Sequence, residues 1–321
     1  MNTSLPDILT RDGWRSWFAS LPPAPPPVTS IPEAQQPPAQ SGVTDYWMRH
    51  NVTLNHQFTA AEESLAYLRW RNDQYFGYIE LMPVDGQDGQ VVLDFGCGPG
   101  HDLVGFATMS RLARLFGADV SPTSLAEARA RLALHGAPCE FLTLKMGDEL
   151  PLATASVDYV HTSGVLHHLP DPLATLRELR RVLRPGGMAR VMVYNYDSVW
   201  MHLYVAYIKR LVEGLYQDVT LGEAFGRTTD GEECPISRAY RPSEFTALAA
   251  EAGFTGEFTG AAVSMFEAKV LPQRFDAIQD RRLPEESRRF LLDLTVDEHG
   301  LPRHGNYRAG IDGCYVLKPR P

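Results

Sequence analysis

The sequence lacks both a long hydrophobic run and a strongly basic stretch. No uncharged segment approaches the ~20 residues that a transmembrane helix needs. The first residues, MNTSLPDILTRDGW, show no basic region followed by an apolar core, as a signal peptide would. The net charge is −9 and no Lys/Arg-rich face stands out, which argues against a nucleic-acid partner. We therefore expect a cytoplasmic protein without a membrane span.

Cysteine is scarce as well. The four cysteines are Cys97, Cys139, Cys234 and Cys314. They lack metal-site spacing and are too sparse for a disulfide scaffold, and no Cys/His cluster has zinc-like spacing. We expect reduced thiols and no bound metal. The length of 321 residues allows one large domain or two smaller ones.

The most informative stretch that is present is VVLDFGCGPG, residues 91–100. A short apolar run rich in β-branched residues breaks into glycines, which predicts a buried parallel strand entering a tight turn. Glycines at 96, 98 and 100 permit positive φ and close approach of a ligand to the backbone. Asp94 lies at the carboxyl end of the strand, where open α/β sheets bind ligands.

The spacing of these glycines distinguishes two kinds of cofactor. A dinucleotide site has the pattern G-x-G-x-x-G, but His101 occupies the third glycine position, which disfavours a nicotinamide oxidoreductase. An acid beside the loop suits an ammonium group and would repel a pyrophosphate. The pattern D-x-G-x-G-x-G resembles the first motif of class I S-adenosylmethionine-dependent methyltransferases, with a domain of the type 11/25 kind. The resemblance implies S-adenosylmethionine as cofactor and S-adenosylhomocysteine as product.

Later segments agree with this resemblance, which covers roughly residues 90–255. Leu115–Val120 reads as a second strand that ends near Asp119, 25 residues after Asp94. An acid near this offset accepts hydrogen bonds from ribose hydroxyls in doubly wound folds. The string LRPGG before an apolar strand also resembles the family. Further strands are predicted near 140–144, 156–162, 189–194, 254–265 and 314–317.

The resemblance implies an α/β fold: a doubly wound, Rossmann-like, seven-stranded sheet of order 3-2-1-4-5-7-6 with strand 7 antiparallel. Residues 1–42 are predicted to be a flexible arm with a proline-rich linker, in which Trp14, Trp17 and Phe18 are either a docking element or lid, or loosely held. Residues 43–90 would form a helical cap, with one helix ending before Pro83. Residues 91–321 would form the methyltransferase domain, with cap insertions at about 197–240 and 266–312. Residues 217–240 are expected to be a mobile loop.

The resemblance also implies a set of cofactor-binding residues. Asp148 or Glu149, after the third strand, would hydrogen-bond the adenine amino group, and Asp148 is the better match. The full predicted set is Asp94, Phe95, Gly96, Cys97, Gly98, Gly100, Asp119, Val120, Asp148, Glu149 and Ser163.

A hydroxyl acceptor would need a base to remove its proton. The candidates are His167, His202, His56 and Tyr194, in that order, since histidine titrates near neutrality. Of the neighbours His167 and His168, at least one can instead have a structural role. An amine acceptor that is delivered neutral would need no base.

Aromatic residues in the helical cap and in the first insertion suit a polar small molecule. The predicted acceptor-binding residues are Trp70, Tyr75, Tyr78, Trp200 and Tyr204, although aromatics at helical spacing also serve as core. We expect methyl transfer to a hydroxyl or amine of a sugar, glycan precursor or secondary metabolite. The alternatives are a lipid or quinone acceptor, and a catalytically inactive binding module with the same fold. A homodimer is compatible with the sequence.

Overall fold

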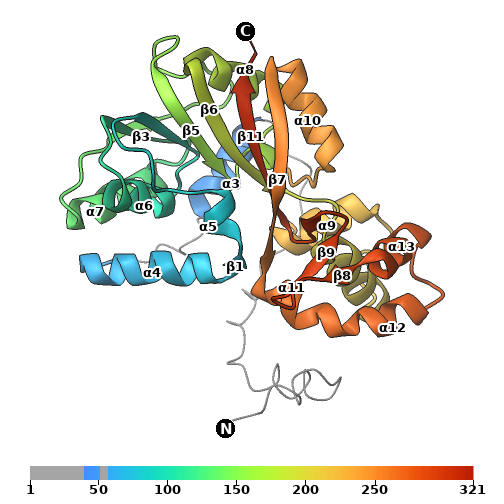
Figure 1. Ribbon diagram of the computed structural model, residues 1–321. Helices are drawn as coiled ribbons and strands as arrows, with labels where there is room; N and C mark the ends of the chain where they lie inside the picture. The colour runs from blue at the N-terminus through green and yellow to red at the C-terminus, as the bar shows by residue number, and fades with distance from the viewer. Residues whose placement is uncertain (1–39, 51–56, 321) are drawn as a thin grey trace.

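The computed structural model describes residues 40–50 and 57–320. The predictions made for the arm, including Trp14, Trp17 and Phe18, and for His56 lie outside these residues. Figure 1 shows a twisted sheet with helices on both faces and a smaller helical lobe at one end of it. None of the described helices has the length and apolar character needed to cross a bilayer.

The sheet has eight strands in the order β1-β7-β11-β6-β5-β2-β3-β4. The central strands run parallel to one another, and β11 lies antiparallel between β6 and β7. The predicted order 3-2-1-4-5-7-6 with an antiparallel seventh strand is confirmed, and one short edge strand, β1, was not predicted. The bounds are β1 Tyr75–Phe76, β2 Val91–Phe95, β3 Arg114–Asp119, β4 Glu140–Thr143, β5 Val157–Ser163, β6 Leu183–Tyr194, β7 Phe254–Ser264 and β11 Asp312–Pro319.

Alternation along β2 explains why helices cover both faces. Val91 and Leu93 belong to the core beneath α8 (Pro172–Val182) and α10 (Pro242–Glu251). Val92 belongs to the core beneath α6 (His101–Met109) and α7 (Pro122–Leu134). A strand that is buried on both sides needs this continuous apolar run. Side chains cap the first turns of α7 and α8, since Ser121 and Asp171 each accept a backbone N–H three residues on.

The string LRPGG was expected to form a turn, but residues 183–187 belong to β6. The pairing of β6 with β5 slips between Val157↔Leu183 and Tyr159↔Met188, so the proline and glycines form an irregular start to the strand. Proline is tolerated at such an irregularity because no ladder hydrogen bond is required of it.

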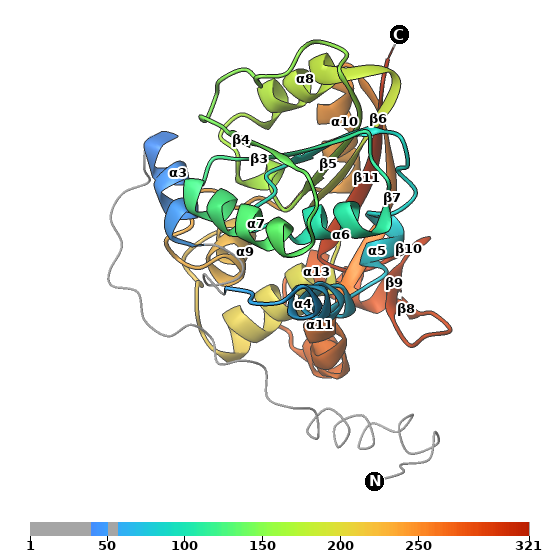
Figure 2. The same ribbon diagram turned by 90° about the vertical axis from the view of Figure 1, so that its left-hand side faces the viewer.

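We expected one helix in the segment before β2, but the structure divides this segment into several elements. It forms α3 (Gln40–Arg49), α4 (Ala61–Asp73), the short strand β1, and α5 (Tyr78–Leu81). Gly77 has φ of 84°, a conformation that interrupts a helix and that glycine adopts without strain. α3 packs beside α7, and α4 packs across α6 and α7 (Figure 2).

The helical lobe has its own apolar core and contains both predicted insertions. The 197–240 region was expected to end in a mobile loop, but residues 221–229 form a helix, α9, whose capping box joins Thr220 and Glu223. The pattern T-x-x-E was the signal for this helix. The lobe contains the π-helical segment η2 Trp200–Val212, α9 Leu221–Thr229, α11 Met265–Val270, η3 Leu271–Gln273, α12 Arg274–Gln279, α13 Glu285–Asp293, β8 Thr295–Val296, β9 Pro302–His304 and β10 Tyr307–Arg308.

Candidate active site

A cavity of about 1180 Å³ opens at the carboxyl ends of the parallel strands. Its walls come from the sheet, from α3 and α4, and from the helical lobe. Pockets for a single small molecule measure ~300–1,000 Å³. The cavity therefore has room for two ligands side by side.

One end of the cavity, the glycine-loop end, contains the predicted cofactor residues. Apart from Gly100, every residue of the predicted cofactor set lines it. Gly100 instead begins α6 with φ of 82°, and a Cβ atom there would lie 3.0 Å from the Cβ of Ala128. Gly96 has φ of 74°, and its Cβ would meet Val165 at 2.2 Å. Both glycines are therefore required by the backbone and by packing, and Gly100 shapes the loop without lining the cavity.

Asp119 is held rigidly at the end of β3. Its two carboxylate oxygens accept the backbone N–H groups of Gly98 and Ser121, each at 2.8 Å. Burial raises the pKa of Asp119, while these N–H groups act against the shift. The remaining lone pairs of a fixed carboxylate can accept hydrogen bonds from hydroxyl groups in the cavity.

A charged network joins α4 to the floor of this end. Arg71 forms an ion pair with Asp102, and His161 Nε2 lies 3.2 Å from the same carboxylate. Burial opposes ionisation of Asp102, but Arg71 and His161 outweigh it and hold the pKa of Asp102 well below its usual range. By contrast, burial raises the pKa of Asp94 to about 7, although His161 and Arg71 act against this shift. Asp94 and Arg71 thus place opposite charges close to the glycine loop.

The other end of the cavity, the aromatic end, contains Tyr75, Trp200 and Tyr194. Trp70 and Tyr78 also line the cavity, but the Tyr78 hydroxyl lies 2.7 Å from Ser163 Oγ, at the glycine-loop end. Tyr204 does not line the cavity, because it packs against Trp200 and Phe266 in the lobe, with ring centroids 4.8 and 4.6 Å away. The sequence did not identify further aromatics in this wall, namely Tyr46, Trp47 and Phe266.

The histidines are arranged differently from our expectation. His167 is fully buried behind the wall, where its ring stacks on Tyr194 at 3.8 Å and accepts the Tyr194 N–H. His202 is buried in the lobe, with Nδ1 3.0 Å from Ser287 Oγ. Neither residue lines the cavity, whereas His168 does. His167 and His202 were predicted to act as bases, but in this structure neither side chain reaches the cavity.

His168 lines the cavity in a defined tautomer. Its Nδ1 lies 2.7 Å from the carbonyl oxygen of Ile236, which can only accept, so Nδ1 donates and Nε2 is the acceptor nitrogen of the neutral ring. Burial lowers the pKa of His168, and Asp230, whose Oδ1 lies 3.9 Å from Nε2, opposes that shift. A proton taken up at Nε2 would therefore face a carboxylate.

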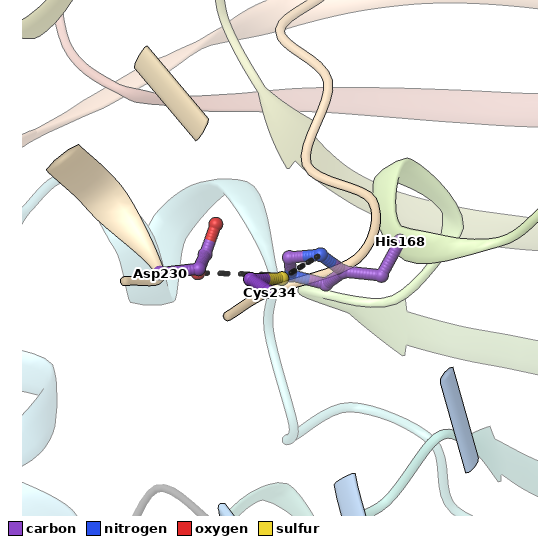
Figure 3. A group of neighbouring side chains, drawn as sticks. All are labelled: His168, Asp230 and Cys234. Atoms are coloured by element: carbon purple, nitrogen blue, oxygen red, sulfur yellow. Dashed lines mark hydrogen bonds and ion pairs between the residues drawn. The ribbon is translucent and has the colours of Figure 1, made fainter. Parts of the chain in front are cut away.

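His168, Asp230 and Cys234 lie side by side, and Figure 3 shows their side chains. Their ligand atoms lie within 4.8 Å of one another, which makes them a candidate metal group in the described chain. The Asp230 carboxylate already accepts the hydroxyls of Tyr194 at 2.8 Å and Ser237 at 2.6 Å. The Cys234 thiol lies 3.4 Å from the carbonyl of Ile236, which also accepts from His168. Hydrogen bonds thus hold each member of the group in place.

Asp312 is a site residue that sequence reasoning missed. It begins β11 opposite Tyr194 of β6 and lines the cavity with only 4% of its surface exposed. Burial, with a contribution from Glu267, raises the pKa of Asp312 to about 8. A signal was available: the amino end of an antiparallel strand lies at the same sheet edge as the carboxyl ends of its parallel neighbours. Asp230, within the presumed loop, had no such signal.

Comparison with known proteins identifies the domain at the glycine-loop end. Residues 92–187 match the family described as methyltransferase domain. The resemblance to class I S-adenosylmethionine-dependent methyltransferases is therefore confirmed for this part of the chain, which is a methyltransferase domain of that class.

Individual relatives differ in what they act on. An uncharacterized 37.1 kDa protein in transposon TN4556 of Streptomyces fradiae is 32% identical over 46% of this chain and 44% of its own length. A ubiquinone biosynthesis O-methyltransferase of Pseudomonas paraeruginosa is 28% identical over 44% of this chain and 64% of its own. A trans-aconitate 2-methyltransferase of Azoarcus is 32% identical over 40% of this chain and 53% of its own. The chain thus spans less than two thirds of each relative.

Among solved structures, the YcgJ protein from Bacillus subtilis aligns with 81% of this chain and 99% of its own. The TM-score is 0.47 and the sequence identity is 16%.

Proposed function

We propose that the protein is a methyltransferase that uses S-adenosylmethionine and acts on a small molecule. The observation that carries the proposal is one cavity in which the glycine loop and Asp119 face an aromatic wall. S-adenosylmethionine would supply a methyl group on a positively charged sulfur.

The residues present fit this cofactor. Asp119 offers a fixed carboxylate for the ribose hydroxyls, and Asp148 or Glu149 is proposed to bind the adenine amino group. Asp94 lines the cavity beside the glycine loop and suits the ammonium group. Arg71 suits the carboxylate, since a guanidinium can serve a second carboxylate besides Asp102.

The chain itself would position the acceptor, exclude water and remove a proton. Alignment of two reactants at near-attack distance contributes ~7–11 kcal/mol in well-oriented systems. His168 Nε2 is proposed as the proton acceptor in place of His167, because it lines the cavity and its tautomer is fixed by Ile236. Tyr194 holds Asp230, which faces His168.

A quinone or lipid is the second candidate acceptor, supported by the relative named for ubiquinone biosynthesis. This relative matches only 44% of the chain, so the match does not decide which acceptor the aromatic end binds. Experiment must separate the two acceptor classes.

Thermal unfolding with S-adenosylmethionine, S-adenosylhomocysteine and NAD tests the cofactor. At a hundredfold excess over Kd, binding should add ~2.7 kcal/mol, a rise in Tm of roughly 2–4 °C. The proposal expects this rise with both sulfur compounds and none with NAD. No rise with either sulfur compound would refute it. Binding without any methylated product in an acceptor screen would favour the inactive binding module.

A further inference from the structure

The cavity is strongly acidic for one that receives a small molecule. Nine of its lining residues are Asp or Glu, whereas Arg71 and Lys145 are its Lys or Arg residues. Arg71 is paired with Asp102, and Lys145 is exposed just after β4, at the glycine-loop end. Two of the acids, Asp230 and Asp312, lie at the aromatic end. Arg71 acts on Asp312 through its charge, but no Lys or Arg forms an ion pair with either acid among the described residues.

Asp312 differs from the other buried acid beside it, Glu267, in its hydrogen bonding. Among the described residues its side chain accepts no hydrogen bond, although it is nine-tenths buried. Its neighbour Glu267 is also buried but is fully held, by the N–H groups of Ser264, Trp200 and Ile311 and the hydroxyl of Ser264. A buried carboxylate without partners is costly, so Asp312 depends on a proton, on water or on a ligand in the cavity that it lines.

Asp230 adds a second acid across the same space. It accepts from Tyr194 and Ser237, and it forms no ion pair with a Lys or Arg among the described residues. Asp312 and Asp230 both act on the hydroxyl of Tyr75. Burial raises the pKa of Tyr75, and the charges of Asp312, Glu267 and Asp230 raise it further, while Arg71 lowers it. Both acids therefore lie close enough to Tyr75 to act on the same part of the cavity.

The remaining wall is aromatic. Trp200 and Phe266 lie with ring centroids 5.3 Å apart on the lobe side, and Tyr75 lines the same cavity. Aromatic faces attract cations, and desolvated contacts are the strongest. Carboxylates combined with aromatic faces favour a positively charged guest over a neutral one.

We propose that the methyl acceptor is an amine, bound as its ammonium ion between Asp312 and Asp230 against Tyr75, Trp200 and Phe266. This inference rests on the proposed methyltransferase function and assigns its substrate class. It favours the amine among the hydroxyl and amine acceptors considered from the sequence.

The reaction balances with groups already described. One ammonium proton passes to Nε2 of His168, and Asp230 faces the resulting imidazolium. The freed lone pair on nitrogen forms the bond to the methyl carbon, while the carbon–sulfur bond breaks and its electron pair stays on sulfur. The sulfonium becomes a neutral thioether, the product is a methylated ammonium ion, and His168 returns its proton to solvent.

Matched acceptor pairs test the proposal on the full chain loaded with S-adenosylhomocysteine. The pairs are 2-phenylethylamine with 2-phenylethanol, and glucosamine with glucose, and calorimetric titration measures each affinity. We expect the amine of at least one pair to bind tenfold or more tightly than its alcohol. Equal or tighter binding of the alcohols, or no amine binding at millimolar concentration, would overturn the proposal.

Variants distinguish a wrong acceptor class from a wrong methyltransferase assignment. Asp312→Asn and Asp230→Asn should each weaken amine binding about tenfold and leave the affinity for S-adenosylhomocysteine unchanged, which also reports that the variant is folded. Asp293→Asn, an exposed acid in the lobe, is the matched control and should change neither affinity. Loss of S-adenosylhomocysteine binding in the wild type would instead refute the methyltransferase function.

The two acids could also serve the positive sulfur of the cofactor. In that case Asp312→Asn would weaken binding of S-adenosylmethionine but not of the uncharged S-adenosylhomocysteine, and would leave the amine preference intact. That pattern would contradict the proposal.

Discussion

The two ends of the cavity are built in opposite ways. The glycine-loop end comes from short contiguous segments at the ends of β2, β3 and β5, with backbone N–H groups fixing Asp119. The aromatic end is assembled from α3, β1, η2, the turn after α9, and the start of β11. The first end therefore depends on local backbone geometry, and the second depends on how distant segments pack together.

The largest expected effect separates His168 from His167. His168→Gln should lower kcat by roughly 10²–10⁴-fold, the usual contribution of a positioned proton acceptor. His167→Gln should act mainly on stability, because His167 is buried behind the wall and stacks on Tyr194. Steady-state kinetics and thermal unfolding of both variants provide the measurement. An equal loss of kcat in the two variants, without a change in Tm, would contradict this assignment.

A pH dependence is expected from Asp312. Its pKa is raised from 3.8 to about 8 in the folded protein, so the folded state binds this proton more tightly than the unfolded state. The stabilisation is present below about pH 4 and is lost as pH rises through about 8. The charged and titratable groups that face it are Glu267, Arg71, Tyr75, Tyr194 and Cys314.

The difference in unfolding free energy between wild type and Asp312→Asn isolates this group. Measured in denaturant without ligands, the difference should fall as pH rises toward about 8 and then level off. An amine acceptor should reduce the fall, because it stabilises the ionised carboxylate. A difference that does not depend on pH would show that Asp312 ionises normally.

A smaller effect distinguishes two tryptophans that line the same cavity. Trp200 is partly buried against Phe266, whereas Trp70 is 51% exposed. Trp200→Ala should raise KM for an amine about five- to tenfold, through loss of a cation–π contact of ~1 kcal/mol. Trp70→Ala should change KM less than twofold. Initial rates at saturating cofactor measure both, and a larger effect at Trp70 would place the acceptor elsewhere.

The smallest expected effect is that of metal removal. His168, Asp230 and Cys234 already have hydrogen-bond partners, and the proposed role of His168 requires a free Nε2. Treatment with EDTA should leave the initial rate unchanged. A loss of activity that added Zn²⁺ restores would show that this group binds a metal and would displace His168 as proton acceptor.

The sequence could predict the sheet because its strands are short, apolar and bounded by glycine and proline. The same local signals located Asp94, the loop glycines and Asp119, since a parallel strand places its last residue at the binding edge. Helix α9 was not predicted, because the polar composition of residues 217–240 favours a loop. The capping box of Thr220 and Glu223 was the signal in favour of a helix.

The aromatic end could not be predicted in the same way. Tyr75 and Trp200 were identified by residue type, but the same reasoning included Tyr204, which turns into the lobe core. Which of two adjacent histidines faces the cavity depends on a short turn after β5 and on Ile236, nearly seventy residues later. Tertiary packing decides which of these side chains face the cavity, and the local sequence does not predict that packing.

Titration of S-adenosylhomocysteine into wild type, Asp119→Ala and Asp312→Asn tests the division of the cavity most directly. Asp119→Ala should weaken binding about a hundredfold, since it removes the carboxylate proposed to accept two hydroxyl hydrogen bonds. Asp312→Asn should bind as the wild type does. Unchanged binding in Asp119→Ala, or a comparable loss in Asp312→Asn, would contradict the assignment of cofactor and acceptor to separate ends.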